Sequence, residues 1–562
     1  MAKTAPGPAP TPKTLPTPAA PAPAAKVCPV ILAAVILAGL VGIAGRLWLT
    51  SLAPRWAYNW DHFDNIQMGR TASQEGLFRA YEAKAPPSLP PGEALPPGRY
   101  VPDVRGQIWQ EAYHDFVPFV RQAVREVNYP PLGLALYWAQ SSLLEAVAPG
   151  QPVNTFTSRL VMSLASVLAE LAAAVAAFLI VRRLVGTNAG LLAAAACWLL
   201  PPMAMDSSFW GQTDAWFIAP ALFTIWLMIR GRWVGAGVLS AITLLLKPQG
   251  IFLGPVVLMA AILLPVEAPE PALPAILKRL ALAAGSGLAA FFVLGLPWLV
   301  GCGTQWIQLA YLGNVGLYIE TTMKAFNVWY LDALLHDMDL AEVLYVKTQV
   351  LGINKDTWGT LLVAASLIAL AILYYKKFPR KGPLAVVLFS AVWLWSTFEW
   401  PTGVHERYIM YAIPMMVIAA FAMKRLWPAA VVLALVGSFE LCHNVWLERH
   451  AGSRVYPPTV RSIYNSVREQ SLQTGRTPPS RAEVVRYVQQ GARQEREELA
   501  YLHARQKTQE LEWFLTLACL AAYGWAFAAP FLNLGGAPPK GKPSTTDRPH
   551  LTDKAPPIQK RK

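Results

Sequence analysis

The sequence has little charge. Asp, Glu, Lys and Arg make up 15% of its 562 residues, whereas an average soluble protein carries about 25%. An intrinsically disordered chain needs high charge and low hydrophobicity, so a content of 54% hydrophobic residues excludes disorder for the chain as a whole. Irregularly placed Gly and the 48 Pro residues exclude a collagen-like or coiled-coil chain. The class that remains is a polytopic membrane protein, and long apolar runs support it.

Cysteine is also scarce. The five Cys residues are odd in number and form no Cys-x-x-Cys pair, which argues against a disulfide framework and against a zinc knuckle. Most of them lie within apolar runs, where an unpaired Cys acts as a small hydrophobic residue. They are Cys28, Cys197, Cys302, Cys442 and Cys519.

The net charge of +14 is concentrated at the two ends of the chain. Residues 1–26 contribute +3 and residues 538–562 contribute +5, so more than half of the excess lies in two Pro-rich tails. Nucleic-acid binding requires a folded basic face. The sequence shows no such face, and we therefore expect no nucleic-acid partner.

Twelve apolar segments predict helices that cross the membrane. The first is long enough for a hydrocarbon core of about 30 Å and lies too far from the N-terminus for an ordinary signal peptide. The segments cover approximately residues 28–50, 158–181, 188–206, 213–229, 233–247, 249–264, 279–300, 357–375, 383–400, 405–423, 426–446 and 512–532. They predict an all-α polytopic membrane protein with about 12 transmembrane helices.

A further apolar segment, residues 132–148, decides the topology. Short basic clusters mark cytoplasmic loops, and this chain has such clusters near residues 182, 230, 278, 376–381 and 424. If residues 132–148 crossed the membrane, these clusters would fall outside the cell. Because the segment is only about 17 residues long, begins with Pro-Pro and carries Glu145, we expect an interfacial or re-entrant helix. Both termini then lie in the cytoplasm, and residues 51–157 form a large outer loop with interfacial helices.

With this topology, the polar residues at the span ends collect on the outer face, where an ionisable group near lipid is a functional candidate. Asp61 and Asp64 lie beside aromatic residues in the first outer loop, and a desolvated carboxylate there can act as a general base. Alternatively, either one caps a short helix. Asn128 and Tyr129 precede a Pro-Pro pair near the end of the same loop.

Two later segments add hydrogen-bonding groups. The sequence Trp-Gly-Gln-Thr-Asp at residues 210–214 lies between two spans, and Gln212 and Asp214 suit sugar hydroxyls, although Asp214 is also a possible helix cap. Lys247 and Gln249 interrupt an otherwise apolar stretch. A lysine at such a position either extends to the membrane surface or meets an anion.

Three cations lie on the same side. Arg407 is suited to bidentate binding of phosphate oxygens, and His405 adds a second donor. The alternative is an ion pair of Arg407 with Glu406 at the interface. Arg159, at the outer end of the second span, is a further phosphate ligand or an interface anchor. A phosphate bound at lipid depth beside a polar site suggests a lipid-phosphate substrate.

The ordered set of motifs resembles the GT-C superfamily of membrane glycosyltransferases, in particular the bacterial mannosyltransferase-like members related to families 87 and 39. The resemblance covers roughly residues 28–446. The matching pieces are Asp61, Gly76-Leu77-Phe78, Asn128-Tyr129-Pro130-Pro131-Leu132, Trp210-Gly211-Gln212-Thr213-Asp214, Leu246-Lys247-Pro248-Gln249, Phe326-Asn327-Val328-Trp329 and His405-Glu406-Arg407-Tyr408. One departure is Asn128, since this position commonly carries Asp and an Asn cannot act as a base.

The resemblance implies an enzyme that moves a hexose, mannose-like, with inversion from a polyprenyl-phosphate sugar to a glycan, lipid or protein acceptor. The reaction would take place on the outer face of a bacterial inner membrane, without a metal or other cofactor. The resemblance implies Asp61 as the general base with Asp64 in reserve, and His405, Arg407, Lys247 and Arg159 as ligands of the lipid phosphate. The expected substrate-binding residues are Asn128, Tyr129, Gln212, Asp214, Gln249 and Glu406.

Two other functions compete with this interpretation. A secondary transporter also combines broken helices with polar residues, but it would show internal repeats and charges at mid-span, whereas here the charges lie at span ends. A catalytically inactive accessory subunit of the same fold is disfavoured by the presence of Asp61, Lys247 and the residues 405–407.

The sequence predicts six parts along the chain. They are a Pro/Ala-rich cytoplasmic tail (1–26), a catalytic transmembrane module (27–300), a variable transmembrane module (301–446) with an outer loop (301–356), an outer-face helical segment (447–511), the last span (512–532) and a basic cytoplasmic tail (533–562).

Overall fold

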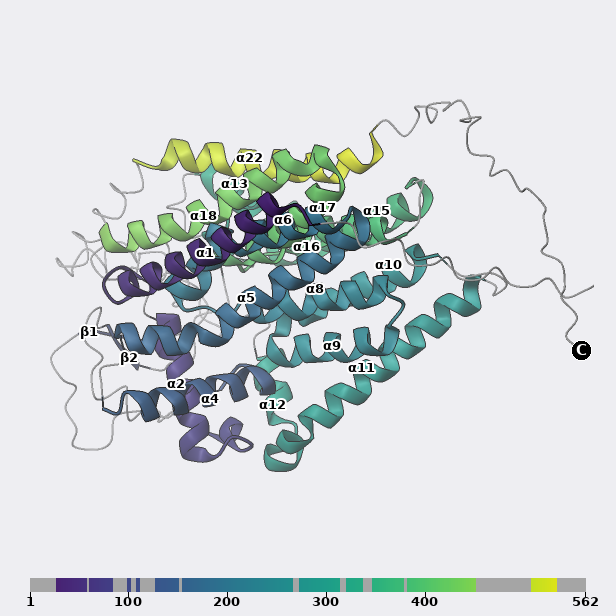
Figure 1. The fold of residues 1–562 in the computed structure, drawn as a ribbon. Helices are drawn as coiled ribbons and strands as arrows, with labels where there is room; N and C mark the ends of the chain where they lie inside the picture. The colour runs from purple at the N-terminus through teal and green to yellow at the C-terminus, as the bar shows by residue number, and fades with distance from the viewer. Residues whose placement is uncertain are drawn as a thin grey trace, which may run out of the picture.

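The structure, a computed structural model, is a bundle of helices that run side by side (Figure 1). It describes residues 27–57, 60–83, 99–102, 108–111, 127–150, 154–265, 272–313, 320–336, 346–378, 382–450 and 507–532. The predicted tails, residues 1–26 and 533–562, lie outside the described residues, and so does most of the predicted outer-face segment, residues 451–506.

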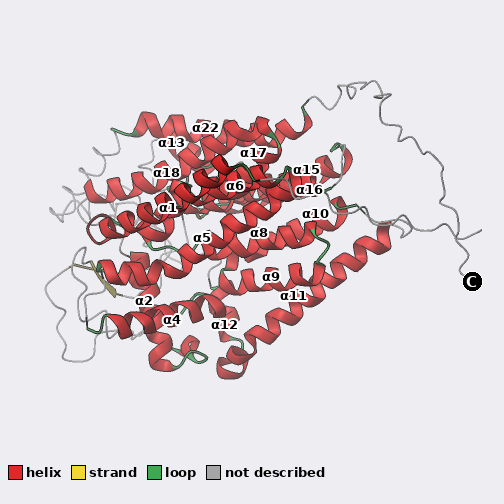
Figure 2. Cartoon of the chain, viewed as in Figure 1, coloured by secondary structure: helices red, strands yellow, loops and turns green. Residues whose placement is uncertain are grey.

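Helices make up nearly all of the described chain (Figure 2). The longest are α1 (Pro29–Trp56), α5 (Phe156–Leu184), α11 (Ala272–Cys302), α15 (Lys355–Lys376), α18 (Trp427–His450) and α22 (Gln509–Ala528). Shorter helices are α2 (Trp60–Glu75), α4 (Pro131–Val147), α6 (Thr187–Trp198), α7 (Pro201–Ala204), α8 (Ala215–Ile229), α9 (Trp233–Leu246), α10 (Leu253–Leu263), α12 (Gln305–Ile307), α13 (Val328–Leu335), α16 (Pro383–Glu399) and α17 (Ile413–Ala422).

Strands are few and short among the described residues. β1 (Arg99–Pro102) pairs antiparallel with β2 (Ile108–Glu111), and β4 (Gln349–Val350) pairs antiparallel with β5 (Ile353–Asn354). β3 (Thr322–Met323) pairs parallel with β6 (Val404–His405), which joins two loops that are far apart in the sequence.

The all-α polytopic fold predicted from the sequence is confirmed. Among the described residues, six helices are long and apolar enough to cross a membrane, and a seventh candidate is a pair bent by 44°, Thr187–Trp198 with Pro201–Trp210. Four shorter apolar helices match further predicted spans: Ala215–Ile229, Trp233–Leu246, Pro248–Leu263 and Pro383–Glu399. The total of twelve spans stays a prediction.

One predicted boundary differs from the structure. The span predicted at residues 405–423 begins as an α-helix only at Ile413, because β6 and a 3-10 turn, Glu406–Tyr411, precede it. The charged residues 405–407 lie in this strand and 3-10 segment, outside the α-helix. The apolar segment 132–148 forms α4, which has 17 residues and is not among the candidate spans of the described chain.

The helices separate into a buried centre and a lipid-facing rim. All residues of α16 from Ala385 to Glu399 are buried, as expected for a helix that is apolar on every side. In α11, by contrast, only 11% of the most apolar window is buried. An apolar side chain can face lipid without burial in protein, because lipid tails are as apolar as the side chain. We therefore expect this rim to contact lipid.

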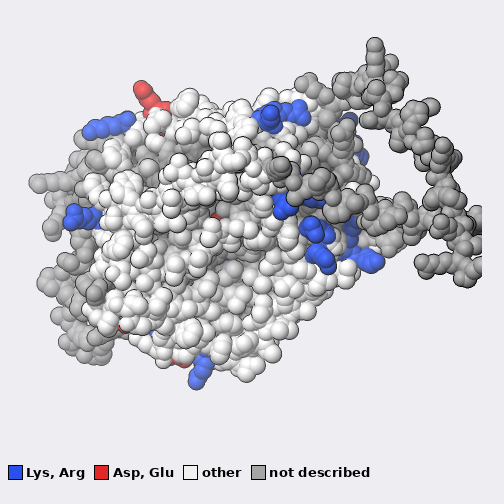
Figure 3. All heavy atoms as spheres, viewed as in Figure 1, with Lys and Arg blue, Asp and Glu red and all other residues white. Residues whose placement is uncertain are grey.

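Basic residues gather at one end of the bundle. Figure 3 shows Lys and Arg side chains concentrated at its right-hand end. Arg182 and Arg183 end α5, Lys376 ends α15, and Lys424 and Arg425 lie in the turn before α18. Loops that are far apart in the sequence thus place their basic residues at the same end of the bundle, as expected if that end faces the cytoplasm.

The N-terminal helix α1 packs through a narrow stripe. Its buried residues are Ala38, Gly42, Arg46, Thr50 and Ala53, which recur about once per turn. Arg46 forms a buried ion pair with Glu170 of α5 at 2.6 Å and lies 3.7 Å above the ring of Trp198 in α6. The indole Nε1 of Trp198 donates to the carbonyl of Gly39 at 3.3 Å. This ring is therefore held between α1 and the Arg46 guanidinium.

Replacing Gly42 by Ala is expected to destabilise the protein. A Cβ at Gly42 would lie 2.0 Å from Nε1 of Trp198, and overpacking of this kind costs about 1–3 kcal/mol. Gly39→Ala is the matched control, since nothing lies within 4 Å of the Cβ at that position. Thermal unfolding in detergent should show a lower midpoint for Gly42→Ala only. Equal midpoints for the two variants would contradict the packing of α1 described above.

Candidate active site

A turn between two spans forms the centre of the site. It starts with a π-helical turn, Met205–Trp210, and reverses at Gly211, whose φ of 86° lies in the left-handed region that favours glycine. The backbone N–H groups of Gly211 and Gln212 both donate to the carbonyl of Asp206, at 3.0 and 2.9 Å. π-Helical turns are frequent at functional sites. The local chain geometry thus explains why glycine stands at residue 211.

Neighbouring helices bind the carbonyl groups of this turn. Arg159 of α5 donates to the carbonyl of Trp210 at 3.2 Å, and Ser166 of the same helix donates to that of Gln212 at 2.9 Å. Asn65 of α2 donates to the carbonyl of Gly211 at 3.1 Å. Because each of these carbonyls is satisfied by a side chain, the turn is fixed against both α2 and α5.

Two tyrosines hold the next residue of the turn. The hydroxyls of Tyr129 and Tyr137 both lie 3.3 Å from the hydroxyl of Thr213, and their rings pack edge to face, 5.0 Å apart. Tyr129 precedes α4 and Tyr137 lies within it, so this contact fixes α4 to the turn.

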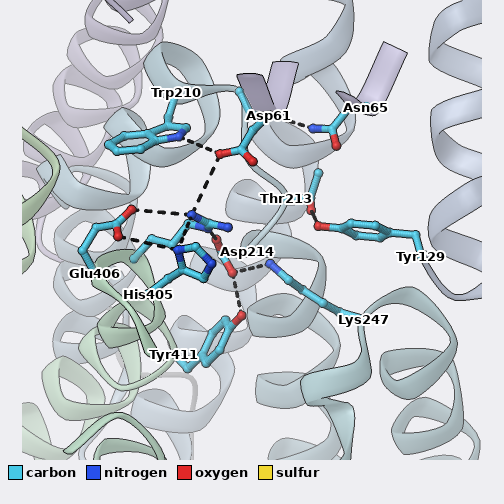
Figure 4. A network of polar contacts seen from close by, with 12 residues as sticks. Asp61, Asn65, Tyr129, Trp210, Thr213, Asp214, Lys247, His405, Glu406 and Tyr411 are labelled. Carbon is cyan, nitrogen blue, oxygen red and sulfur yellow. Dashed lines mark hydrogen bonds and ion pairs between the residues drawn. The ribbon is translucent and has the colours of Figure 1, made fainter. Parts of the chain in front are cut away.

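The carboxylate of Asp61 lies beside the turn, at the start of α2 (Figure 4). Its Oδ2 accepts a hydrogen bond of 2.9 Å from the indole Nε1 of Trp210. The same oxygen lies 3.9 Å from Nη1 of Arg407. The side chain of Asp61 is 19% exposed, so it is partly desolvated but still accessible to a substrate.

A buried ion pair lies behind Asp61. Lys247, directly after α9, donates to Oδ1 of Asp214, and the hydroxyl of Tyr411 donates to the same oxygen at 2.6 Å. The side chains of Asp214 and Lys247 are buried, and a buried charge is tolerated only when it is paired. Asp214 therefore neutralises Lys247 and anchors the 3-10 turn that carries Tyr411.

Arg407 lies between three carboxylates. It is 3.9 Å from Asp61 through Nη1, 3.8 Å from Asp214 through Nε, and 3.5 Å from Glu406 through Nη1. These distances are longer than the 2.7–2.9 Å of a direct charge-assisted hydrogen bond. Nε of Arg407 is buried and makes no hydrogen bond within the described chain. The guanidinium is thus surrounded by negative charge while donor capacity remains for a ligand.

His405 contacts Arg407 directly. Its Nδ1 lies 3.2 Å from Nη1 of Arg407 and 3.7 Å from Oε2 of Glu406. In the tautomer that carries the ring proton on Nε2, Nδ1 accepts from the guanidinium. Burial and the positive charge of Arg407 lower the pKa of His405. A lowered pKa favours the neutral ring at physiological pH.

Most of the residues proposed from the sequence come together here. Six segments of the chain contribute to one polar cluster, made up of Asp61, Tyr129, Arg159, Gln212, Asp214, Lys247, His405, Glu406 and Arg407. The other three are placed by the segments around it. Asp64 is half-buried and lies three residues further along α2, Asn128 directly precedes Tyr129, and Gln249 lies in a 3-10 turn, two residues after Lys247.

The sequence interpretation gave no role to four residues that contact the cluster. Asn65, Trp210 and Tyr411 make the hydrogen bonds described above, and the charges of Asp214, Lys247 and Arg407 act on the buried Asp206. Asp206 had a usable signal, because an acidic residue inside an apolar run is a functional candidate. Trp210 belonged to the Trp-Gly-Gln-Thr-Asp motif but received no role of its own, and nothing in the local pattern distinguishes Tyr411 from an ordinary aromatic residue of a span.

The described residues contain no group of three or more His, Cys, Asp or Glu side chains that could hold a metal ion. What the cluster offers instead is an accessible carboxylate close to a guanidinium with unused donors. Such a pair can accept a proton at one point and stabilise a developing anion at another.

A comparison with protein families found a match over part of the chain: the family model described as dolichyl-phosphate-mannose-protein mannosyltransferase matches residues 154–298. This match supports a glycosyltransferase of the mannosyltransferase-like group. It spans α5 to α11 and includes Arg159, Asp214 and Lys247, but neither Asp61 nor residues 405–407. No curated protein matches the chain.

Proposed function

We propose that this protein transfers a hexose, mannose-like, from a polyprenyl-phosphate sugar to an acceptor hydroxyl with inversion at the anomeric carbon. The observation that carries the proposal is the pairing of Asp61, a partly exposed carboxylate, with the Arg407 guanidinium at 3.9 Å. The family match to mannosyltransferases over residues 154–298 supports the same chemistry.

In the proposed reaction, Asp61 accepts the proton of the acceptor hydroxyl. The acceptor oxygen forms a bond to the anomeric carbon, and the bond from that carbon to the phosphate oxygen breaks. The electron pair of the broken bond stays with the departing polyprenyl phosphate. A general base of this kind contributes typically about 10²–10⁴-fold to the rate.

The leaving phosphate is proposed to bind Arg407, because its buried Nε lacks a hydrogen bond and its guanidinium suits two phosphate oxygens. His405 adds the donor at Nε2. Lys247 and Arg159, the two other proposed phosphate ligands, are both engaged within the protein: Lys247 pairs with Asp214, and Arg159 binds the carbonyl of Trp210. We propose that these two cations contribute mainly through the field they add to the site.

The sugar is proposed to lie between the turn and the outer ends of α4 and α9. Its hydroxyls require acceptors and donors of the amide, hydroxyl and carboxylate type. The residues proposed for this role are Asn128, Tyr129, Gln212, Asp214, Gln249 and Glu406. Because protein cations are available for the phosphate, the proposal includes no metal or other cofactor.

The reaction is proposed to occur on the outer face of a bacterial inner membrane, with both chain termini in the cytoplasm. The basic ends of α5 and α15 support this orientation, since positively charged loops stay cytoplasmic. Asp61, after α1, then lies on the opposite side. The acceptor is a glycan, a lipid or a protein.

A donor panel tests the proposal. The purified protein in proteoliposomes is incubated with polyprenyl-phosphate mannose, glucose and other hexoses and with simple glycan, lipid and peptide acceptors, and acceptor-dependent release of polyprenyl phosphate is measured. We expect release with at least one donor. The release should occur on the side of the membrane from which an impermeant thiol reagent labels the Gly150→Cys variant. A folded protein that releases no polyprenyl phosphate from any donor would instead fit an inactive accessory subunit.

A further inference from the structure

The turn contacts α2 at two points, one helical turn apart. The indole of Trp210 donates to Asp61, and the carbonyl of Gly211 accepts from Asn65. Residues 61 and 65 lie on the same face of α2 because they are four apart. Two consecutive residues of the turn therefore fix the helix segment that carries the carboxylate.

Within the described part of the chain, the hydrogen bond and the ion contact of the Asp61 carboxylate fall on the same oxygen. Trp210 donates to Oδ2 at 2.9 Å, and Nη1 of Arg407 lies 3.9 Å from Oδ2. Because a carboxylate has two oxygens with separate lone pairs, Oδ1 is the atom that remains to receive a proton. The rotation of the carboxylate is thus set by the indole.

The same hydrogen bond keeps Asp61 from joining Arg407. A carboxylate and a guanidinium that are free to meet form a direct pair at about 2.7–2.9 Å, whereas here they stay 3.9 Å apart. Trp210 is 2% exposed, and its carbonyl is held by Arg159, which is also bound to Asn154 at 3.1 Å. Burial of the ring and the fixed backbone therefore restrict how far the indole can follow the carboxylate.

We propose that Trp210 is a positioning residue for the base: it presents Oδ1 of Asp61 to the acceptor hydroxyl and keeps Oδ2 away from Arg407. This inference rests on the proposed function, since it requires Asp61 to be the base. Arg159 supports the arrangement by fixing the backbone of Trp210. The titratable groups that face Asp61 from the elements around it are Arg407, His405, Arg159 and Tyr137.

The test is Trp210→Phe, which removes the N–H and keeps most of the ring. We expect kcat to fall about 10- to 100-fold, the effect of losing one hydrogen bond to a charged group. The acid limb of the pH–rate profile should move to higher pH than in the parent chain, because the variant lacks an N–H donor that favours the charged carboxylate. The donor KM should rise as well, because Arg407 must leave a new pair with Asp61.

Trp298→Phe is the matched control. Trp298 is also buried, and its indole Nε1 donates at 3.0 Å, but to the backbone carbonyl of Leu77. We expect this variant to keep the acid limb of the parent chain. If Trp210→Phe does not yield folded protein, Trp210→Leu, a smaller side chain that also lacks the donor, should show the same shift.

An acid limb for the folded Trp210 variant that coincides with that of Trp298→Phe would overturn the positioning role. This result is distinguishable from failure of the proposed function. If the proposed function fails, the folded parent chain releases no polyprenyl phosphate from any donor. If only the assignment of the base fails, the parent chain is active and Asp61→Asn transfers sugar as fast as the parent chain.

Discussion

Replacing Asp61 by Asn is expected to lower kcat by about 10²–10⁴-fold, the usual contribution of a general base, without unfolding the protein. The amide has nearly the same shape as the carboxylate, and its oxygen can still accept a hydrogen bond from the indole of Trp210. In the parent chain this indole donates to Asp61 at 2.9 Å. It cannot take a proton from the acceptor hydroxyl. The measurement is single-turnover release of polyprenyl phosphate, with the thermal unfolding midpoint recorded for the same preparation.

Asp64→Asn is the matched control, because it changes the same residue type on the same helix. Asp64 is half-buried and lies three residues further along α2, so it is on nearly the same face of the helix, but it is Asp61 that accepts from Trp210 and lies 3.9 Å from Arg407. We expect its variant to keep most of the activity. If Asp64→Asn is inactive and Asp61→Asn is active, the base is Asp64, and the role proposed for Trp210 falls with it.

Replacing Arg407 by Gln is expected to lower kcat/KM by about 10²–10³-fold, the typical cost of losing one preorganised donor to a developing anion. Both kcat and KM should change, since the guanidinium is proposed to bind the phosphate before the reaction and to bind it more strongly as the charge of the leaving phosphate grows. Transfer kinetics at several donor concentrations separate the two. Arg407→Lys should recover only part of the loss, because an ammonium group cannot bind two phosphate oxygens in the same plane.

The control for this prediction is Arg425→Gln at the basic end of the bundle, where the side chain binds the carbonyl of Leu532 at 2.7 Å. Removing Arg407 also leaves Asp61, Asp214 and Glu406 close together without their shared cation. The thermal unfolding midpoint of Arg407→Gln is therefore measured first. The activities of the two glutamine variants are then compared at a temperature below that midpoint. Equal activities for the two glutamine variants would remove Arg407 from the phosphate site.

The sequence supported a good prediction of the fold because bilayer thickness constrains a membrane helix. A run of apolar residues must be long enough to cross the hydrocarbon core, and its polar backbone must be satisfied within the helix. The spans predicted at residues 28–50 and 357–375 therefore correspond closely to the helices Pro29–Trp56 and Lys355–Lys376. The prediction was less accurate at residues 405–423, where hydropathy cannot show that residues 404–411 adopt a strand and a 3-10 turn.

Candidate residues could also be predicted, but not their contacts. Charge is scarce in this chain, so each polar residue at a span end was conspicuous, and nine of the twelve proposed site residues lie in one polar cluster. From the sequence, Lys247 was expected to extend to the membrane surface or to meet an anion such as the lipid phosphate, whereas in the fold it pairs with Asp214, 33 positions away. The hydrogen bond from Trp210 to Asp61 joins residues 149 positions apart, and no local pattern encodes such a distance.

What the sequence determined by itself is the class of the protein, the approximate positions of its spans and a short set of chemically suitable residues. These follow from composition, hydropathy and motif order, which are local properties of the chain. The tertiary structure decided how those residues are used: which oxygen of Asp61 is held by Trp210, which cation is already neutralised, and which guanidinium keeps unused donors. The physical reason is that a hydrogen bond or an ion pair is made or lost when the distance between its two atoms changes by a few tenths of an ångström. Only the packing of the whole bundle sets these distances between atoms on different helices.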